Sequence, residues 1–177
     1  MTKIVDLNIY RERLFHDRAF GPWKRRFNET YDAASRLADL SDKTLLFLAR
    51  PGDAGTFAFY EIIMGTLDLG KAAEFYALDK QNQLKVVDAH LFLADQVRFE
   101  LMRRLGWVVR FACQDRALVD LVRQTERLKT ESRGSPPELS PAHAAYATFR
   151  DLTARDQEAF IRRLLAEALE SFKHRVG

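Results

Sequence analysis

Residues 79–106 have the sequence DKQNQLKVVDAHLFLADQVRFELMRRLG, and the packing of the remaining chain depends on what this stretch forms. Apolar residues occupy nearly every direction around a helical axis, which predicts a helix over about 80–105 buried in the middle of a bundle. Asp79 is placed to cap its start. Gly106, after two arginines that suit a helix C-terminus, is placed to end it.

Apolar residues at helical spacing also predict helices on the N-terminal side of this stretch. Residues 4–20 predict a first helix that Gly21 and Pro22 terminate, and Pro22 then begins a second helix over about 22–38. Asp53 is expected to cap another helix. The sequence therefore predicts an all-α fold, a single-domain multi-helix bundle around the central buried helix.

A stretch rich in proline and serine, TESRGSPPELSP at residues 130–141, predicts an exposed loop because it cannot continue a helix. This loop joins a body, residues 1–130, to a C-terminal helical segment, residues 141–177. We expect a helical pair there, its last helix capped by Thr153. So short a segment cannot bury a core of its own, so it should pack on the body or on another subunit, within one domain spanning 1–177.

Two short apolar runs leave a second fold open. TLLFLA at residues 44–49 and WVVRFA at residues 107–112 could each be a buried strand of an α/β or α+β fold. Periodicity cannot separate a short buried strand from a short buried helix. The scarcity of β-branched residues and of further strand candidates favours the all-α interpretation.

Composition points to a cytoplasmic protein. The longest run without Asp, Glu, Lys or Arg, residues 139–149, is too short to cross a membrane. The first residues lack the apolar region of a secretory signal. Cys113 is the only cysteine, so no internal disulfide can form and a reducing compartment is the default.

The net charge of +3 is unevenly distributed along the 177 residues. Residues 1–26 carry +4, residues 27–95 carry −5, residues 96–133 carry +4, and the remainder is neutral. Acidic and basic segments of this kind can neutralise each other within one subunit or across a symmetric dimer. A nucleic-acid interface is a weaker interpretation, because the basic excess is small. It would use Lys24, Arg25, Arg26, Arg103, Arg104, Arg110 and Arg116.

The central stretch carries the best polar cluster. Asp88 and Asp95 are seven residues apart and so share one face of the helix, and Arg98 follows three residues after Asp95. Buried carboxylates need partners. One interpretation is a ligand pocket to which Glu61 and Glu74 add acidic groups. The other is structural pairing of Asp95 with Arg98, and of Asp88 with a cation or helix N-terminus elsewhere.

A weaker candidate is RPGDAGT at residues 50–56. Arg50, Gly52, Gly55 and Thr56 precede or begin a helix whose free N–H groups could hold an anion. Asp53 argues against this, because its side chain would cap the same groups.

Histidine, cysteine and carboxylate residues show no metal-site spacing, so we expect no metal and no cofactor. The absence of catalytic motifs and the segregated charge predict a non-enzymatic interaction or scaffold protein, whose partner is another protein or a second copy. The alternative is a small-molecule-binding protein or enzyme with a polar pocket beside the central helix. Nucleic-acid binding comes third, and no membrane partner is expected.

Overall fold

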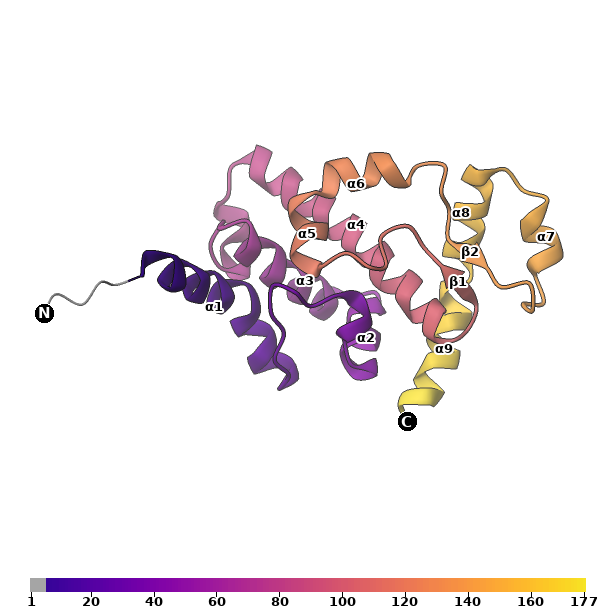
Figure 1. The fold of residues 1–177 in the computed structure, drawn as a ribbon, viewed down its shortest axis with the longest axis horizontal. Helices are drawn as coiled ribbons and strands as arrows, with labels where there is room; N and C mark the ends of the chain where they lie inside the picture. The colour runs from indigo at the N-terminus through magenta and orange to yellow at the C-terminus, as the bar shows by residue number, and fades with distance from the viewer. Residues whose placement is uncertain (1–5) are drawn as a thin grey trace, which may run out of the picture.

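The long helix α4, Lys80–Arg104, crosses the middle of the computed structural model, which describes residues 6–177 (Figure 1). Its predicted ends are confirmed. The Asp79 side chain accepts a hydrogen bond from the Asn82 amide at 2.7 Å. Gly106 has a φ of 78°. Its amide donates to the Arg103 carbonyl, and the Trp107 amide donates to the Met102 carbonyl, each at 3.0 Å. This pair of bonds is the Schellman motif, which needs a residue with positive φ.

Helices and short segments from the whole described chain surround α4, so the all-α bundle is confirmed. They are α2 (Asp42–Ala49), α3 (Asp53–Thr66), α5 (Leu118–Arg123), α6 (Thr125–Ser132), α9 (Leu165–Val176) and the 3₁₀ turn η1 (Leu37–Asp39). A second 3₁₀ segment, η2 (Ala72–Ala77), packs on α3. Val97 and Leu101 of α4 are completely buried in the core. One connected apolar core contains residues of α1 through α9, including Ile161 and Phe172.

The N-terminal helix α1, Leu7–Phe27, runs without a break through Gly21 and Pro22, so the prediction of two helices was wrong. Proline lacks an N–H, which leaves the Arg18 carbonyl without its helical donor. The backbone of Gly65 on α3 packs at this place, so closely that a Cβ there would lie 2.3 Å from the Arg18 oxygen. Packing against α3 therefore keeps the helix continuous across the proline. Residues 4 and 5 of the predicted helix lie outside the described residues.

The predicted second helix ends early, because Asn28 takes a left-handed conformation with φ 55° and closes α1. The irregular segment after it is held by the Glu29 carboxylate, which accepts hydrogen bonds from the Tyr31 hydroxyl and from Thr44 Oγ1. The aromatic ring of Tyr31 is buried against Trp23, so the apolar spacing that predicted a helix reflects burial of a loop.

The two strand candidates have different outcomes. Residues 44–49 are helical and belong to α2, so a strand there was wrong. Residues 107–112 contain a true strand, β1 (Val108–Arg110), which pairs antiparallel with β2 (Glu138–Leu139). The partner strand comes from the proline-rich stretch, whose first residues are still helical because α6 continues to Ser132. This two-stranded ribbon is the only sheet among residues 6–177.

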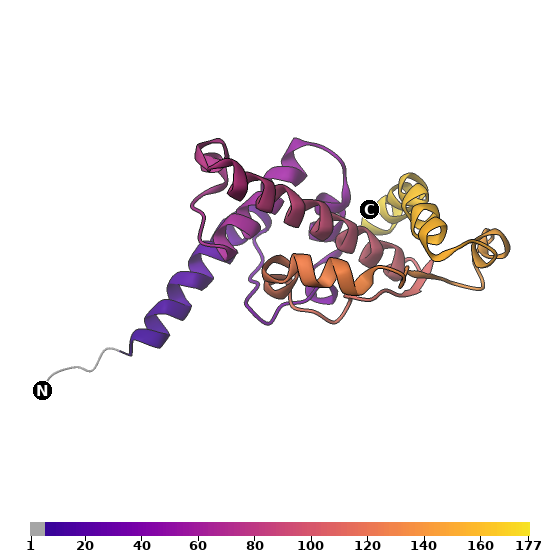
Figure 2. The ribbon, with the colours of Figure 1, turned by 90° about the horizontal axis from the view of Figure 1, so that it is seen from above.

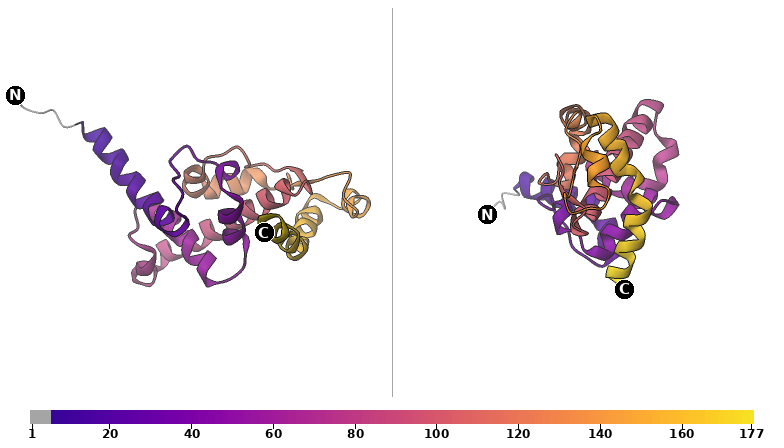
Figure 3. Two further views of the ribbon diagram at one scale, coloured as in Figure 1. Left: turned by 90° about the horizontal axis from the view of Figure 1, so that it is seen from below. Right: turned by 90° about the vertical axis from the view of Figure 1, so that its right-hand side faces the viewer.

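After the ribbon the chain forms α7 (Tyr146–Arg150), α8 (Ala154–Arg163) and α9. Thr153 caps α8 by accepting from the Asp156 amide at 3.3 Å, as predicted. The last predicted helix is divided at Leu164 into α8 and α9. Helix α9 packs on α2 and α4, whereas α7 lies at the far end of the molecule (Figures 1 and 3).

Gly65→Ala should destabilise the fold by about 3 kcal/mol, because the new methyl group would strike the Arg18 backbone, which cannot rotate away. Urea unfolding followed by circular dichroism measures this free energy. Gly21→Ala is the matched control on the other side of the same crossing. A Cβ at Gly21 meets only the Arg25 side chain at 3.6 Å, so this variant should gain about 0.5–1 kcal/mol from helix propensity. A Gly65→Ala protein as stable as wild type would contradict the close contact.

Candidate functional site

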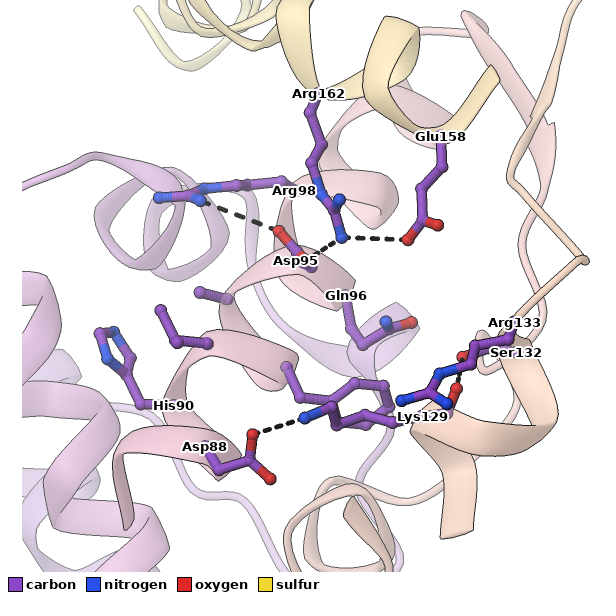
Figure 4. A pocket seen from close by; sticks show the side chains of 13 residues that line it. Asp88, His90, Asp95, Gln96, Arg98, Lys129, Ser132, Arg133, Glu158 and Arg162 are labelled. Carbon is purple, nitrogen blue, oxygen red and sulfur yellow. Dashed lines mark hydrogen bonds and ion pairs between the residues drawn. The ribbon is translucent and has the colours of Figure 1, made fainter. Parts of the chain in front are cut away.

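A cavity of about 520 Å³ lies between α4, α6 and α8 (Figure 4). This volume falls within the range of small-molecule sites. Asp88, Asp95 and Arg98 all line it, so the structure brings these three predicted residues to one place. The lining also includes His90, Leu91, Phe92, Ala94, Gln96, Lys129, Ser132, Arg133, Glu158 and Arg162.

Asp95 is held mainly by Arg162 of α8, at 2.8 Å, and the same guanidinium contacts Glu158 at 3.0 Å. The predicted partner Arg98 is more distant, with its Nη1 4.0 Å from the carboxylate, and its Nε donates to the Ala49 carbonyl at 3.5 Å. Burial lowers the pKa of the Arg162 guanidinium, but Asp95 and Glu158 outweigh it and raise that pKa overall. Arg162 therefore stays charged and ties α8 to α4.

Asp88 is paired with Lys129 of α6, whose Nζ lies 2.5 Å from a carboxylate oxygen. The two acids of the predicted cluster thus bind cations on two different helices. Both partners lie far along the chain, 41 and 67 residues from their acids. No spacing pattern in the sequence connects residues so far apart, which is why sequence analysis missed Lys129 and Arg162.

Gln96 is a polar residue of the lining without a protein partner. The residue is 5% exposed, and its amide makes no hydrogen bond within the described part of the chain. Among the described residues Thr66 Oγ1 is the enclosed side-chain atom left without a partner, so the Gln96 amide stays open to the cavity. Figure 4 shows it between the group of Asp95, Arg162 and Glu158 and the group of Lys129, Ser132 and Arg133. Arg133 forms no ion pair with any residue in 6–177. No sequence pattern marks either residue as part of a site.

His90 lies at the edge of the cavity and contacts the rings of Phe59, at 5.2 Å between centroids, and Tyr60, at 5.6 Å. Burial lowers the pKa of this imidazole, and the charge of Arg98 lowers it further. At neutral pH His90 is therefore an uncharged aromatic residue.

Glu61 and Glu74 are not at this cavity. Both line a second groove of about 650 Å³ between α1, α3 and η2, with Leu14, Pro22 and Phe57 among its apolar residues. Glu61 is paired with Arg26, whose Nε donates at 2.8 Å. The predicted five-residue ligand set is therefore divided between two places.

The loop at residues 50–56 has a structural explanation. Gly52, not Asp53, is the N-cap of α3, and its φ of 134° suits only glycine. A Cβ on Gly55 would lie 3.2 Å from the Arg50 carbonyl, so this glycine permits α2 and α3 to approach. Thr56 Oγ1 donates back to the Gly52 carbonyl at 3.1 Å. Anion binding there stays a prediction without further support.

The residues predicted to bind nucleic acid are spread over α1, the end of α4, β1 and the loop before α5. Four have carboxylate partners: Arg26 with Glu61, Arg103 and Arg104 with Glu100, and Arg110 with Glu138. Lys24, Arg25 and Arg116 are exposed and make no ion pair with another described residue. With four of seven charges compensated, little basic surface remains for a phosphate backbone.

Glu100 is fully buried and accepts from Arg103 through two bonds of 2.8 Å and from Arg104 Nε at 3.1 Å. Arg104 also binds Asp42 at 2.9 Å and the Leu37 carbonyl at 2.9 Å. The carboxylate raises the pKa of Arg103. These arginines therefore hold helices together.

A second surface stands out on α1. One face of its C-terminal half is buried, with Phe20 and Trp23 each 1% exposed, whereas its first turns extend away from the body (Figures 2 and 3). Large apolar side chains on these turns are open to solvent: Leu7 63%, Ile9 56%, Tyr10 56% and Leu14 40% exposed. Leu14 also belongs to the groove that contains Phe57, itself 43% exposed.

Comparison of the chain with protein-family models, with curated proteins and with solved structures finds no match. Within residues 6–177 no helix combines the length and apolar character needed to cross a bilayer. In the same residues no three His, Cys, Asp or Glu side chains cluster as metal ligands would.

Glu100→Gln should lower the free energy of unfolding by about 3 kcal/mol, because it leaves part-buried Arg103 without a carboxylate and Arg104 with Asp42 alone. The control is Glu131→Gln, whose ion pair with Arg127 is 3.5 Å long and more than half exposed; it should change stability by less than about 0.5 kcal/mol. Urea unfolding of both variants at pH 7 gives the comparison. Equal losses of unfolding free energy in the two variants would show that the buried Glu100 carboxylate does not stabilise the fold more than an exposed ion pair does.

His90 should make stability depend on pH. Its pKa is lower in the folded protein than the ordinary value of 6.5, so the unfolded chain takes up the proton first as pH falls. This contribution is present above pH 6.5 and is lost as pH falls below it. His90→Asn should therefore lose less unfolding free energy than wild type between pH 7.5 and pH 5.5, by up to about 1 kcal/mol. A His143→Asn control, at a residue outside the cavity, should keep the wild-type slope, and an unchanged slope in His90→Asn would contradict the assignment.

Proposed function

We propose that this chain is a non-enzymatic interaction protein that associates with a second copy of itself through the first turns of α1. The observation that carries the proposal is the exposed apolar stripe of Leu7, Tyr10 and Leu14 on a helix that projects from the body. Exposed apolar clusters of this kind mark protein interaction sites.

Helix energetics support the proposal. Residues 7–18 form three turns, about 18 Å of helix, and isolated helices of that length are marginal in water. Neighbouring elements cover the face of α1 that carries Phe15, on which Arg123 stacks at 4.6 Å from the ring centroid. The stripe of Leu7 and Tyr10 has no such cover among the described residues. A partner that covers it would stabilise the helix as well as the complex.

A second copy fits this stripe by symmetry. Two antiparallel α1 helices that cross at Leu14 would bring Leu7 of each copy beside Gly21 of the other, because both lie seven residues from the crossing point. Pro22 and Phe57 next to that position already line an apolar groove. The stripe of each copy would therefore pack against the groove of the other, which gives two equivalent contacts.

The expected affinity is modest. Six half-exposed side chains gain about 1 kcal/mol each on full burial, or about 6 kcal/mol together. Association costs at least about 4 kcal/mol, which leaves about 2 kcal/mol from these side chains alone. A dimer measurable below about 1 mM therefore requires further apolar contacts from the groove that contains Phe57.

We also propose a cytoplasmic location, supported by a single cysteine, Cys113, which is buried and forms no disulfide. Burial raises the pKa of this thiol, so it is a poor nucleophile at neutral pH.

Light scattering across a concentration series should show the average mass rising from monomer towards dimer. The double variant Leu7→Glu, Leu14→Glu should stay monomeric, because charges at a buried helix pair are not tolerated. Leu84→Glu is the matched control, since Leu84 is 61% exposed on α4, away from the stripe, and it should associate like wild type.

Salt separates this apolar mechanism from charge pairing. Burial of Leu7, Tyr10 and Leu14 predicts association that persists in 0.5 M salt. At this ionic strength screening reduces the interaction between charges 10 Å apart to about a tenth. If the protein stays strictly monomeric at concentrations up to about 1 mM, where the binding free energy is about 4 kcal/mol, self-association is ruled out.

A further inference from the structure

The geometry points to the cavity between α4, α6 and α8 as the binding site of a compact organic oxyanion, a carboxylate or phosphate ester, held by Arg133 and Gln96. This site is separate from the α1 stripe and does not depend on self-association. The reasons are the charge balance of its lining, the state of Gln96 and the mixed character of its wall.

One cation of the cavity lining has no acidic partner. Three acids face the cavity, and each is engaged: Asp88 by Lys129, and both Asp95 and Glu158 by Arg162. Arg98 lies against Asp95 and the Ala49 carbonyl. Arg133 is the remaining cation of the lining, with no ion pair to any residue from 6 to 177. A guanidinium is suited to bind an oxyanion through two parallel hydrogen bonds.

Gln96 supplies the second, independent observation. A primary amide can make up to four hydrogen bonds. Gln96 is 5% exposed, makes no hydrogen bond to another described residue, and keeps its amide open to the cavity that it lines. In Figure 4 it lies between the Arg162 group and the Lys129 and Arg133 group. A bound molecule between these groups would be within reach of its amide.

The wall also restricts the ligand. Leu91, Phe92 and Ala94 contribute apolar surface beside the polar groups, so a ligand with a short carbon skeleton fits better than a free inorganic ion. The amide of Gln96 both donates and accepts, which favours a hydroxyl, amide or second carboxyl group on that skeleton. The volume of about 520 Å³ is suited to such a molecule.

The test is a ¹⁵N NMR titration that follows the side-chain amide signals of Gln96, identified by their loss in Gln96→Leu. The probes are succinate and glycerol 3-phosphate, each against sodium chloride at equal ionic strength. We expect a saturable shift with at least one probe, and the responding probe distinguishes a carboxylate from a phosphate ligand. Shifts that match sodium chloride, or no saturation with either probe, would overturn the proposal.

Variants test the two named residues. Arg133→Gln should weaken binding by about tenfold or more, the loss expected for a charged hydrogen bond. Arg127→Gln is the matched control, because Arg127 lies on α6, the helix that Arg133 caps, is exposed and is absent from the lining; it should bind like wild type. Equal weakening in both variants would show a general charge effect and overturn the assignment.

The Gln96→Leu variant distinguishes a ligand-binding role of the amide from a structural role, because the two roles predict opposite changes in melting temperature and binding. If the amide serves a ligand, the apolar replacement of similar size should leave the melting temperature unchanged or higher while abolishing the response of the backbone amides around the cavity to the probe. A lower melting temperature together with retained binding would show that Gln96 supports the fold and not the ligand.

Discussion

The buried carboxylate of Glu100 is the interaction on which the arrangement of the helices depends. A carboxylate with no exposed surface costs several kcal/mol unless it is paired, and both Arg103 and Arg104 converge on it. Arg104 continues outward to η1 through the Leu37 carbonyl and to α2 through Asp42. Arg175 of α9 then contacts Asp42 and donates to the Arg104 carbonyl at 2.6 Å. One buried charge thus links segments from residue 37 to residue 175.

This network also positions the cavity. Asp95 lies five residues before Glu100 on α4, about 7.5 Å along the helix axis. Helix α8, which carries Arg162, leads directly into α9, which the network holds against α2 and α4. The wall of the cavity is therefore built from elements whose positions the Glu100 network restrains. The first turns of α1 lie outside that network, which is why they can project from the body (Figure 2).

The elements that sequence analysis predicted well are those set by local chemistry. The limits of α4 follow from a capping aspartate and a glycine with positive φ, and Thr153 begins α8 in the same way. The errors arose where contacts across the fold outweighed a local signal. Gly21 and Pro22 signal a helix end, but the close approach of Gly65 stabilises α1 through them. Val108 and Val109 form a strand only because residues 138–139 offer a partner.

For the candidate site the division is similar. The spacing of Asp88 and Asp95 places both on one face of α4, because seven residues make almost two full helical turns. Their partners, Lys129 and Arg162, lie 41 and 67 residues away. Local sequence thus established that the chain is a helical bundle with a polar face on its central helix. Which cations meet that face, and that Gln96 is left facing a cavity, depend on how distant helices pack, because ion pairs and cavities form between elements and not within them.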